Sequence, residues 1–184
     1  MHTSVRNKLI SLIALALIVV LGFVFALDNK KQSTIVSEQQ RAFPEFTSSV
    51  LVNSEGVSGQ QKVTLTDVTQ HPYQLVNVWA SWCVICKTEH SFLLQLHDKG
   101  IPIVGLNYRD NSGAAINVLS NAGNPYSTVI SDPQGKLALE LGVIGTPETY
   151  LVDADGQIIK KLSGVINETV WKDELAMYFD GVNG

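Results

Sequence analysis

Cysteines and charged residues are both scarce in this sequence, and each shortage excludes a class of protein. Only two cysteines occur among the 184 residues. An exported domain held together by disulfides needs several cysteines spread along the chain, so this one must be stabilised by ordinary packing. Charged residues make up only 16% of the chain, and no basic cluster offsets its formal net charge of −4. A nucleic-acid partner is therefore not expected.

Charge is absent altogether from residues 9–27, which consist largely of Leu, Ile, Val and Ala. At about 1.5 Å per residue, a helix of this length nearly crosses a hydrocarbon core of about 30 Å. We therefore predict a transmembrane anchor over residues 9–27, a cytoplasmic tail over residues 1–8 and export of the rest. The alternative is a cleavable signal peptide, cut after Val24-Phe25-Ala26.

The part of the chain after the uncharged run divides into a spacer and a domain. All acidic residues lie after Leu27, whereas the basic residues Arg6 and Lys8 precede the run. The exported part is thus more acidic than the whole chain, which argues against anionic lipid surfaces as partners. Residues 28–42 are polar and turn-prone, so they are predicted to be a spacer before a domain over residues 43–184.

The hydrophobic pattern of the domain predicts an α/β fold. A short hairpin is expected within residues 45–70, and a second around the Asp153-Ala154-Asp155-Gly156 turn. Between them, short apolar runs alternate with segments of helical periodicity, and Asn167 would cap a final helix. The order β-α-β-α-β-α-β-β-α predicts a mixed central sheet with helices on both faces. The three intervening strands are expected at residues 74–79, 103–107 and 128–130.

The two cysteines lie where the predicted strand at residues 74–79 gives way to a helix. At a helix N-terminus, Cys83 faces unpaired backbone N–H groups and the positive end of the helix dipole, which stabilise a thiolate. With two residues between them, the Cys86 sulfur can reach back and resolve a mixed disulfide. The spacing therefore predicts a redox pair in which Cys83 is the nucleophile.

Two other interpretations of the pair stay open. A structural disulfide between Cys83 and Cys86 would close a very small loop and add little stability. A metal site could use Cys83, Cys86 and His90, which are spaced along one helical face. A structural zinc usually has four ligands, however, and no convincing fourth ligand is found nearby.

A set of motifs in fixed order resembles a known family. Residues 79–86 (WASWCVIC) look like the thioredoxin active-site motif, and Gly145-Thr146-Pro147 looks like the thioredoxin cis-proline loop. The similarity runs from about residue 74 to residue 171, and it implies a thioredoxin-like fold preceded by one transmembrane helix. Further motifs resemble the DsbE/CcmG group, namely CKTEH at 86–90, NY at 107–108, GNPY at 123–126 and GTPET at 145–149.

The resemblance implies a reductase of c-type cytochrome maturation, anchored in a bacterial inner membrane with its catalytic domain in the periplasm. Its substrate would be the Cys-x-x-Cys-His pair of apocytochrome c or a partner thiol protein, and a membrane reductase of the DsbD/CcdA kind would supply electrons. No metal or other cofactor is implied, since the cysteine pair is the redox centre. A general periplasmic thiol reductase or oxidase stays open, as does a thioredoxin-fold copper or zinc carrier.

The same resemblance implies roles for five residues around the pair. Cis geometry at Pro147 would leave the Thr146 backbone free to pair with an extended substrate segment, and Trp82 would cover the edge of the site. Glu89 and Glu148 are the carboxylates expected to tune the cysteines, because the resolving thiol must lose a proton.

Two positions depart from patterns seen in relatives. Val84 stands where the family usually has Pro, and Asn77 stands where thioredoxins carry a buried Asp. The dipeptide Val84-Ile85 also contains no cation that would stabilise the Cys83 thiolate. A thiolate that is only moderately stabilised makes the pair a better reductant, so the sequence predicts a reducing pair.

Overall fold

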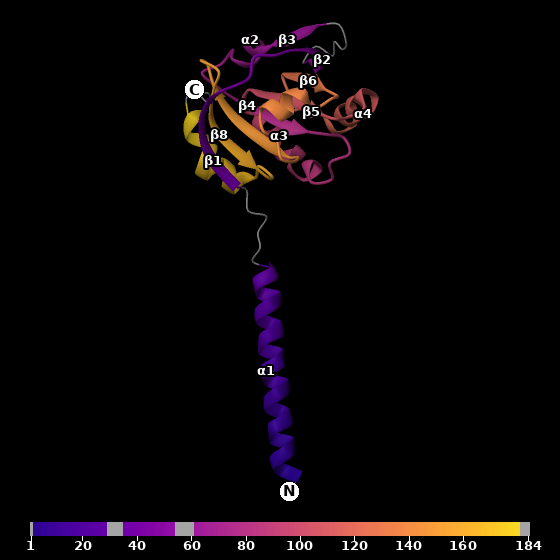
Figure 1. Cartoon of the computed structure of the whole chain (residues 1–184), viewed down its shortest axis with the longest axis vertical. Helices are drawn as coiled ribbons and strands as arrows, with labels where there is room; N and C mark the ends of the chain where they lie inside the picture. Colours follow the sequence, from indigo (N-terminus) through magenta and orange to yellow (C-terminus); the bar gives the residue numbers. More distant parts are fainter. Residues whose placement is uncertain (1, 29–34, 54–60, 181–184) are drawn as a thin grey trace. The chain divides into compact units, whose positions relative to one another are not determined.

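The computed structural model describes residues 2–28, 35–53 and 61–180, and the chain divides into two compact units, Met1–Ser33 and Thr34–Gly184. The described residues of the first unit form the helix α1 at His2–Asp28 (Figure 1). Over the residues described, none of the helices meets the length and apolar character that a membrane span requires.

The second unit is built on one mixed eight-stranded sheet in the order β1-β8-β7-β4-β5-β6-β2-β3. The three strands β4, β5 and β6 run parallel, and every other neighbouring pair is antiparallel. The mixed sheet predicted from the sequence is therefore confirmed. The strands are β1 Ile35–Ala42, β2 Thr47–Asn53, β3 Lys62–Thr64, β4 Tyr73–Trp79, β5 Ile103–Tyr108, β6 Thr128–Asp132, β7 Glu148–Asp153 and β8 Gln157–Ser163.

Helices cover both faces of this sheet, as predicted. Side chains alternate between the faces along β4, so Leu75 and Val76 belong to separate apolar clusters. The cluster of Leu75 includes residues of α3, α4 and the C-terminal turns, whereas the cluster of Val76 includes residues of α5. The helices are α2 Leu65–Val68, α3 Cys86–Asp98, α4 Ser112–Ala122, α5 Lys136–Glu140 and α6 Glu168–Val170, followed by a π turn at Trp171–Leu175 and a 3₁₀ turn at Ala176–Tyr178.

The spacer prediction is wrong for the residues nearest the domain. Helix α1 extends to Asp28, residues 29–34 lie outside the described part, and residues 35–42 form the edge strand β1, paired antiparallel with β8. Polar composition concealed this strand, because an edge strand is held by main-chain hydrogen bonds to its neighbour and needs no apolar run. The compact unit accordingly begins before residue 43.

Two other segments differ in detail from the sequence prediction. The hairpin within residues 45–70 is confirmed as β2 and β3, although β2 also pairs with β6, and residues 54–60 lie outside the described part. Asn167 does cap the last helix, since its Oδ1 accepts the Val170 N–H at 3.0 Å. That helix is only one turn long, and π and 3₁₀ turns continue it.

The sheet brings the two motif-bearing segments to the same edge. Val78 near the end of β4 pairs with Glu148 at the start of β7. The chain leaves β4 toward the cysteines, while Pro147 lies immediately before Glu148. The register of this antiparallel pair therefore sets the proline beside the segment that carries Cys83.

Candidate active site

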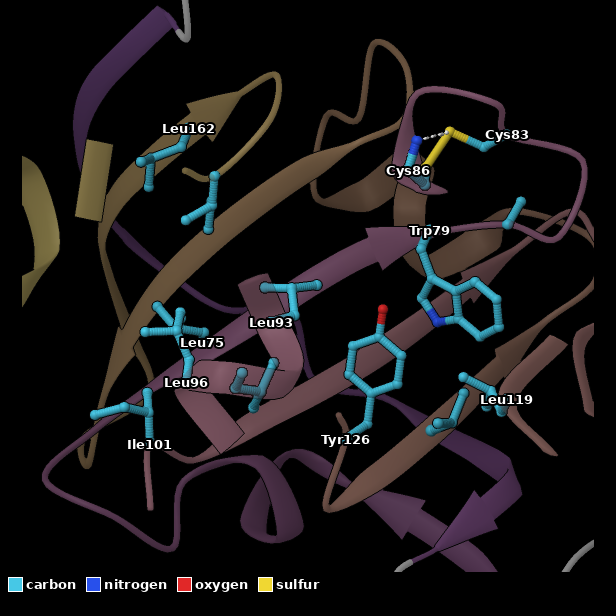
Figure 2. Close-up of a cluster of buried hydrophobic side chains, with 14 of the residues drawn as sticks. Leu75, Trp79, Cys83, Cys86, Leu93, Leu96, Ile101, Leu119, Tyr126 and Leu162 are labelled. Carbon is cyan, nitrogen blue, oxygen red and sulfur yellow. Dashed lines mark hydrogen bonds between the residues drawn. A yellow bond between two sulfur atoms is a disulfide. The ribbon is translucent and has the colours of Figure 1, made fainter. Parts of the chain in front are cut away.

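The cysteines form a disulfide at the start of α3, with a Cα–Cα distance of 5.4 Å. Cys86 is the first residue of the helix, and its backbone N–H donates to Cys83 Sγ over 3.0 Å (Figure 2). When the disulfide opens, this N–H is positioned to stabilise a thiolate on Cys83. Both cysteines are nearly buried, at 4% and 7% exposure. The predicted strand–helix placement of the pair is confirmed.

Asp110, a residue that was not predicted from the sequence, holds the segment before Cys83 in place through hydrogen bonds. Its carboxylate accepts the Ser81 N–H at 2.5 Å, the Ser81 hydroxyl at 2.6 Å and Asn107 Nδ2 at 2.9 Å. Burial works to raise the pKa of Asp110, but the hydrogen bonds to the carboxylate, led by those from Ser81, outweigh it and hold the pKa below its usual value. The clue in the sequence was its position just past β5, because parallel neighbours such as β4 and β5 end at the same edge.

Trp82 lies at the edge of the site, as expected. Its side chain is 55% exposed, and its indole Nε1 donates to the carbonyl of Arg109 over 3.0 Å. Trp79, by contrast, is buried and stacks on Tyr126 with ring centroids 5.6 Å apart. The loop after β5 thus holds both residues that precede Cys83, Ser81 through Asp110 and Trp82 through Arg109.

A buried polar network is centred on Asn77 and includes Glu89 of α3, the helix that begins at the second cysteine. Asn77 Nδ2 donates to Glu89 Oε1 at 2.9 Å and to Thr149 Oγ1 at 3.0 Å, and Asn77 Oδ1 accepts the Tyr126 hydroxyl at 2.9 Å. The other Glu89 oxygen accepts the Ile166 N–H at 2.8 Å. These groups are buried and hydrogen-bonded, which is the condition under which polar groups persist inside a protein.

Glu89 is the predicted carboxylate that shares the site with the cysteines. It follows Cys86 by three residues on α3, so the two side chains lie on one helical face. Burial raises the pKa of Glu89 to about 7, against the opposing hydrogen bonds from the Ile166 N–H and from Asn77. A carboxyl group with this pKa can take up or release a proton near neutral pH, which suits an acid–base partner for a thiol.

Glu148, the second predicted carboxylate, has different surroundings. It is buried, and its Oε2 forms an ion pair with Lys161 Nζ at 3.0 Å. Side chains alternate along β7, so Glu148 faces the α5 side of the sheet with Tyr150, whereas Thr149 faces the α3 side with Asn77. The structure therefore places the two carboxylates on opposite faces of the sheet, and the tuning role of Glu148 stays a prediction.

The peptide bond between Thr146 and Pro147 is cis, which confirms what the motif implied. The Pro147 carbonyl accepts the Gly164 N–H at 3.0 Å, and Thr146 is partly exposed. Nearby on the same loop, Ile144 is 91% exposed. The loop thus presents backbone and an apolar side chain to solvent at the edge where the cysteines lie.

A cleft of about 360 Å³ opens beside Cys86, between α3 and α4. Cys86 lines it together with Trp79, Lys87 and His90. His90 Nε2 lies 3.0 Å from the Gly123 carbonyl oxygen, so that nitrogen is engaged with backbone. Within the described ranges, no three His, Cys, Asp or Glu side chains gather into a group that could hold a metal ion.

Comparison with known proteins agrees with this geometry. The Redoxin family model matches residues 38–176. A thiol:disulfide interchange protein DsbE of Pseudomonas fluorescens biotype C is 44% identical over 142 residues, which cover 77% of this chain and 76% of that protein. DsbE of Escherichia coli strain K12 is 45% identical over 108 residues, covering 59% of this chain and 58% of the relative.

Solved structures resemble the fold at lower sequence identity. A secreted thiol-disulfide isomerase from Corynebacterium glutamicum superposes with a TM-score of 0.63 at 20% identity, over 81% of this chain and 93% of the other. That likeness supports the thioredoxin-like fold, while the sequence relatives and the Cys83–Cys86 pair specify the chemistry. The protein is a thiol–disulfide oxidoreductase, and it belongs to the DsbE/CcmG family of thioredoxin-like proteins.

Proposed function

We propose that this protein reduces disulfides in the periplasm during c-type cytochrome maturation. The observation that carries the proposal is the Cys83–Cys86 disulfide at the start of α3, with the Cys86 N–H directed at Cys83 Sγ. The narrower assignment to cytochrome maturation is supported by the CKTEH and GTPET motifs, which resemble those of the DsbE/CcmG group. The substrate would be the Cys-x-x-Cys-His pair of apocytochrome c or a thiol protein that acts on it.

The reaction follows from the geometry of the pair. In the reduced protein, the Cys83 thiolate attacks one sulfur of a substrate disulfide, and the other substrate sulfur leaves as a thiolate. Cys86 then loses its proton, for which Glu89 is the acceptor we propose, and attacks Cys83 Sγ. The second substrate sulfur leaves, so two electrons have passed to the substrate and the Cys83–Cys86 disulfide has formed. A dithiol of a DsbD/CcdA-like membrane reductase would restore the pair by the same exchange.

The reducing direction is the part of the proposal that a single measurement tests. Val84 and Ile85 are both exposed and uncharged, so no cation between the cysteines stabilises a thiolate. Equilibration with a glutathione buffer should give a potential nearer that of thioredoxin, about −270 mV, than that of the periplasmic oxidant DsbA, about −120 mV. A potential of about −120 mV would show that the protein acts as an oxidase and not as a reductase.

The substrate class has its own test. The reduced protein should transfer electrons to an oxidised synthetic peptide that contains Cys-x-x-Cys-His, with loss of free thiols on the protein matched by gain on the peptide. The Cys83→Ser variant should transfer none. If the peptide stays oxidised while a general protein disulfide is reduced, the protein is a broader periplasmic reductase.

Localisation is a further part of the proposal, and it rests on sequence. The uncharged residues 9–27 lie within α1, and we propose that they anchor the protein in the inner membrane with the catalytic unit in the periplasm. This placement would put the cysteine pair in the compartment where oxidising enzymes act on exported substrates.

A further inference from the structure

The segment that ends at Pro147 has no regular structure of its own. Residues 141–147, here named the proline loop, lie between α5 and β7 and contain neither helix nor strand. Backbone groups in such a segment need partners from elsewhere to hold one conformation. The shape of the proline loop is therefore decided by the groups that bond to it.

Side chains from the three strands β1, β7 and β8 bind the carbonyl groups at the start of the proline loop. Lys161 Nζ on β8 donates to the Gly142 carbonyl over 2.7 Å. The hydroxyl of Tyr150 on β7 lies 3.1 Å from both the Leu141 carbonyl oxygen and Glu148 Oε2, so its one hydrogen is shared between them, and the guanidinium of Arg41 on β1 donates to the same carbonyl. These donors all belong to strands of the sheet, so the sheet holds the start of the proline loop in place.

Glu148 binds the loop further along and connects it to Lys161. Its Oε1 accepts the Ile144 N–H at 3.1 Å, while its Oε2 pairs with Lys161 Nζ at 3.0 Å. The side chains of Lys161 and Glu148 are only 8% and 2% exposed. An ion pair this deeply buried persists only when both charges are satisfied, and here the loop backbone and the hydroxyls of Tyr150 and Ser163 supply the remaining partners.

We propose that Lys161 is a positioning residue for protein substrates. Together with Glu148 it fixes the proline loop in the shape that lets the Thr146 backbone pair with an extended substrate segment next to Cys83. The inference rests on the proposed function, in which the proline loop receives the substrate. Lys161 lies on the α5 face with Tyr150, whereas the cysteines belong to the cluster on the α3 face. Lys161 therefore acts on substrate binding and leaves the chemistry of the cysteine pair unchanged.

The adjacent residue provides a matched control. Lys160 is also nearly buried on β8, but alternation directs it to the other face, where its Nζ pairs with Glu174 Oε2 at 3.1 Å. Lys160→Met and Lys161→Met thus remove the same group from the same strand, but of these two lysines it is Lys161 that bonds to the proline loop.

The experiment compares two probes in the full-length protein. One is a synthetic peptide with an intramolecular Cys-x-x-Cys disulfide, which offers a backbone for pairing. The other is the small aromatic disulfide 5,5′-dithiobis(2-nitrobenzoate), which has no peptide backbone. For Lys161→Met we expect kcat/KM toward the peptide to fall at least tenfold, mainly through KM. The rate with the aromatic disulfide should stay within twofold of that of the unsubstituted protein. The reduction potential should equal that of the unsubstituted protein within experimental error. For Lys160→Met, the ratio of the peptide rate to the aromatic-disulfide rate should be the same as in the unsubstituted protein.

A double variant keeps the test valid where Lys161→Met alone does not fold. Removing only Lys161 leaves the Glu148 carboxylate buried without its partner, and Glu148→Gln in the same chain removes that charge. The double variant should fold and still reduce the peptide at least tenfold more slowly. If Lys161→Met reduces the peptide as fast as Lys160→Met does, or slows both probes equally, the inference is wrong. It is also wrong if the double variant reduces the peptide as fast as Lys160→Met does. If the unsubstituted protein fails to reduce any peptide disulfide, it is the proposed function that fails.

Discussion

At the scale of single residues, the two cysteines have unequal environments. Cys83 Sγ accepts a hydrogen bond from the first N–H of α3, and Cys86 is among the residues that line the cleft between α3 and α4. A sulfur that accepts a helix N-terminal N–H is the better thiolate and the better leaving group. The structure thus supports the order in which Cys83 attacks and Cys86 resolves.

This assignment predicts which variant accumulates mixed disulfides. Cys86→Ser lacks the resolving thiol, so its complex with an oxidised substrate should persist and migrate as a larger species on non-reducing gels. Cys83→Ser lacks the attacking thiolate and should form essentially none. Equal amounts from both variants would contradict the assignment.

The raised pKa of Glu89 predicts that the stability of the fold depends on pH. Burial raises its pKa to about 7 in the folded protein from 4.5 in the unfolded chain, so the folded state binds the proton more tightly. This contribution to the free energy of unfolding is fully present below pH 4.5, is lost as the pH rises to about 7, and changes little above that. A shift of this size corresponds to about 3 kcal/mol.

The Glu89 contribution can be isolated with one substitution. Glu89→Gln cannot titrate, so urea unfolding of this variant should lack the loss of stability between pH 4.5 and 7 that the unsubstituted protein shows. Glu140→Gln, which changes an exposed side chain on α5, should keep that loss. Parallel pH profiles for the unsubstituted protein and Glu89→Gln would show that folding does not raise the pKa of Glu89.

At the scale of elements, the active-site segment is held by the loop after β5. Asp110 accepts both polar hydrogens of Ser81, and the Arg109 carbonyl accepts the Trp82 indole N–H. Strands β4 and β5 are parallel neighbours, so their C-terminal ends meet at one edge and their loops can bond directly. On the other side of β4, the register with β7 sets the proline loop. The two loops frame the cysteine pair.

Asp110→Asn tests whether the hydrogen bonds to Asp110 stabilise the active-site segment. The substitution removes the charge that strengthens the bonds from Ser81 and Asn107, so the free energy of unfolding of the oxidised protein should fall by about 1–2 kcal/mol. Urea unfolding at pH 7 measures the loss. Asp98→Asn, at the exposed C-terminal end of α3, should have no effect or stabilise slightly. A loss no greater than that of Asp98→Asn would show that Asp110 does not stabilise the segment.

At the scale of the whole molecule, the chain has two compact units that differ in composition. The unit that contains α1 carries the uncharged residues 9–27, and the unit that contains the sheet carries the cysteines. Strand β1 opens the second unit and pairs with β8, the strand that supplies Lys161 to the proline loop. The catalytic unit therefore includes residues that the polar composition had assigned to a spacer.

The anchor proposal predicts where the mature protein begins. If residues 9–27 stay in the membrane, the protein should fractionate with membranes, resist extraction by carbonate and keep its N-terminal residues. Mass spectrometry of the intact protein measures this directly. A mature protein that starts near Leu27 and is released with the periplasmic contents would show that the run is a cleaved signal peptide.

The sequence by itself determined the features that depend on neighbouring residues. Spacing identified Cys83 and Cys86 as a redox pair at a strand–helix junction, and the order of apolar runs and helical segments predicted the mixed sheet. Both rest on local patterns of residue types, which the sequence encodes directly. The cis bond at Pro147 was implied by the resemblance of Gly145-Thr146-Pro147 to a thioredoxin loop.

Tertiary structure alone decided the features that depend on residues far apart in the chain. Glu89 and Glu148 look alike in sequence, yet folding placed one in the buried Asn77 network with a raised pKa and the other in an ion pair on the opposite face of the sheet. Asp110 and Lys161 act across 29 and 19 residues of chain, on Ser81 and Gly142. Such contacts are set by strand order and register, because a one-residue change of register moves every side chain of a strand to the other face of the sheet.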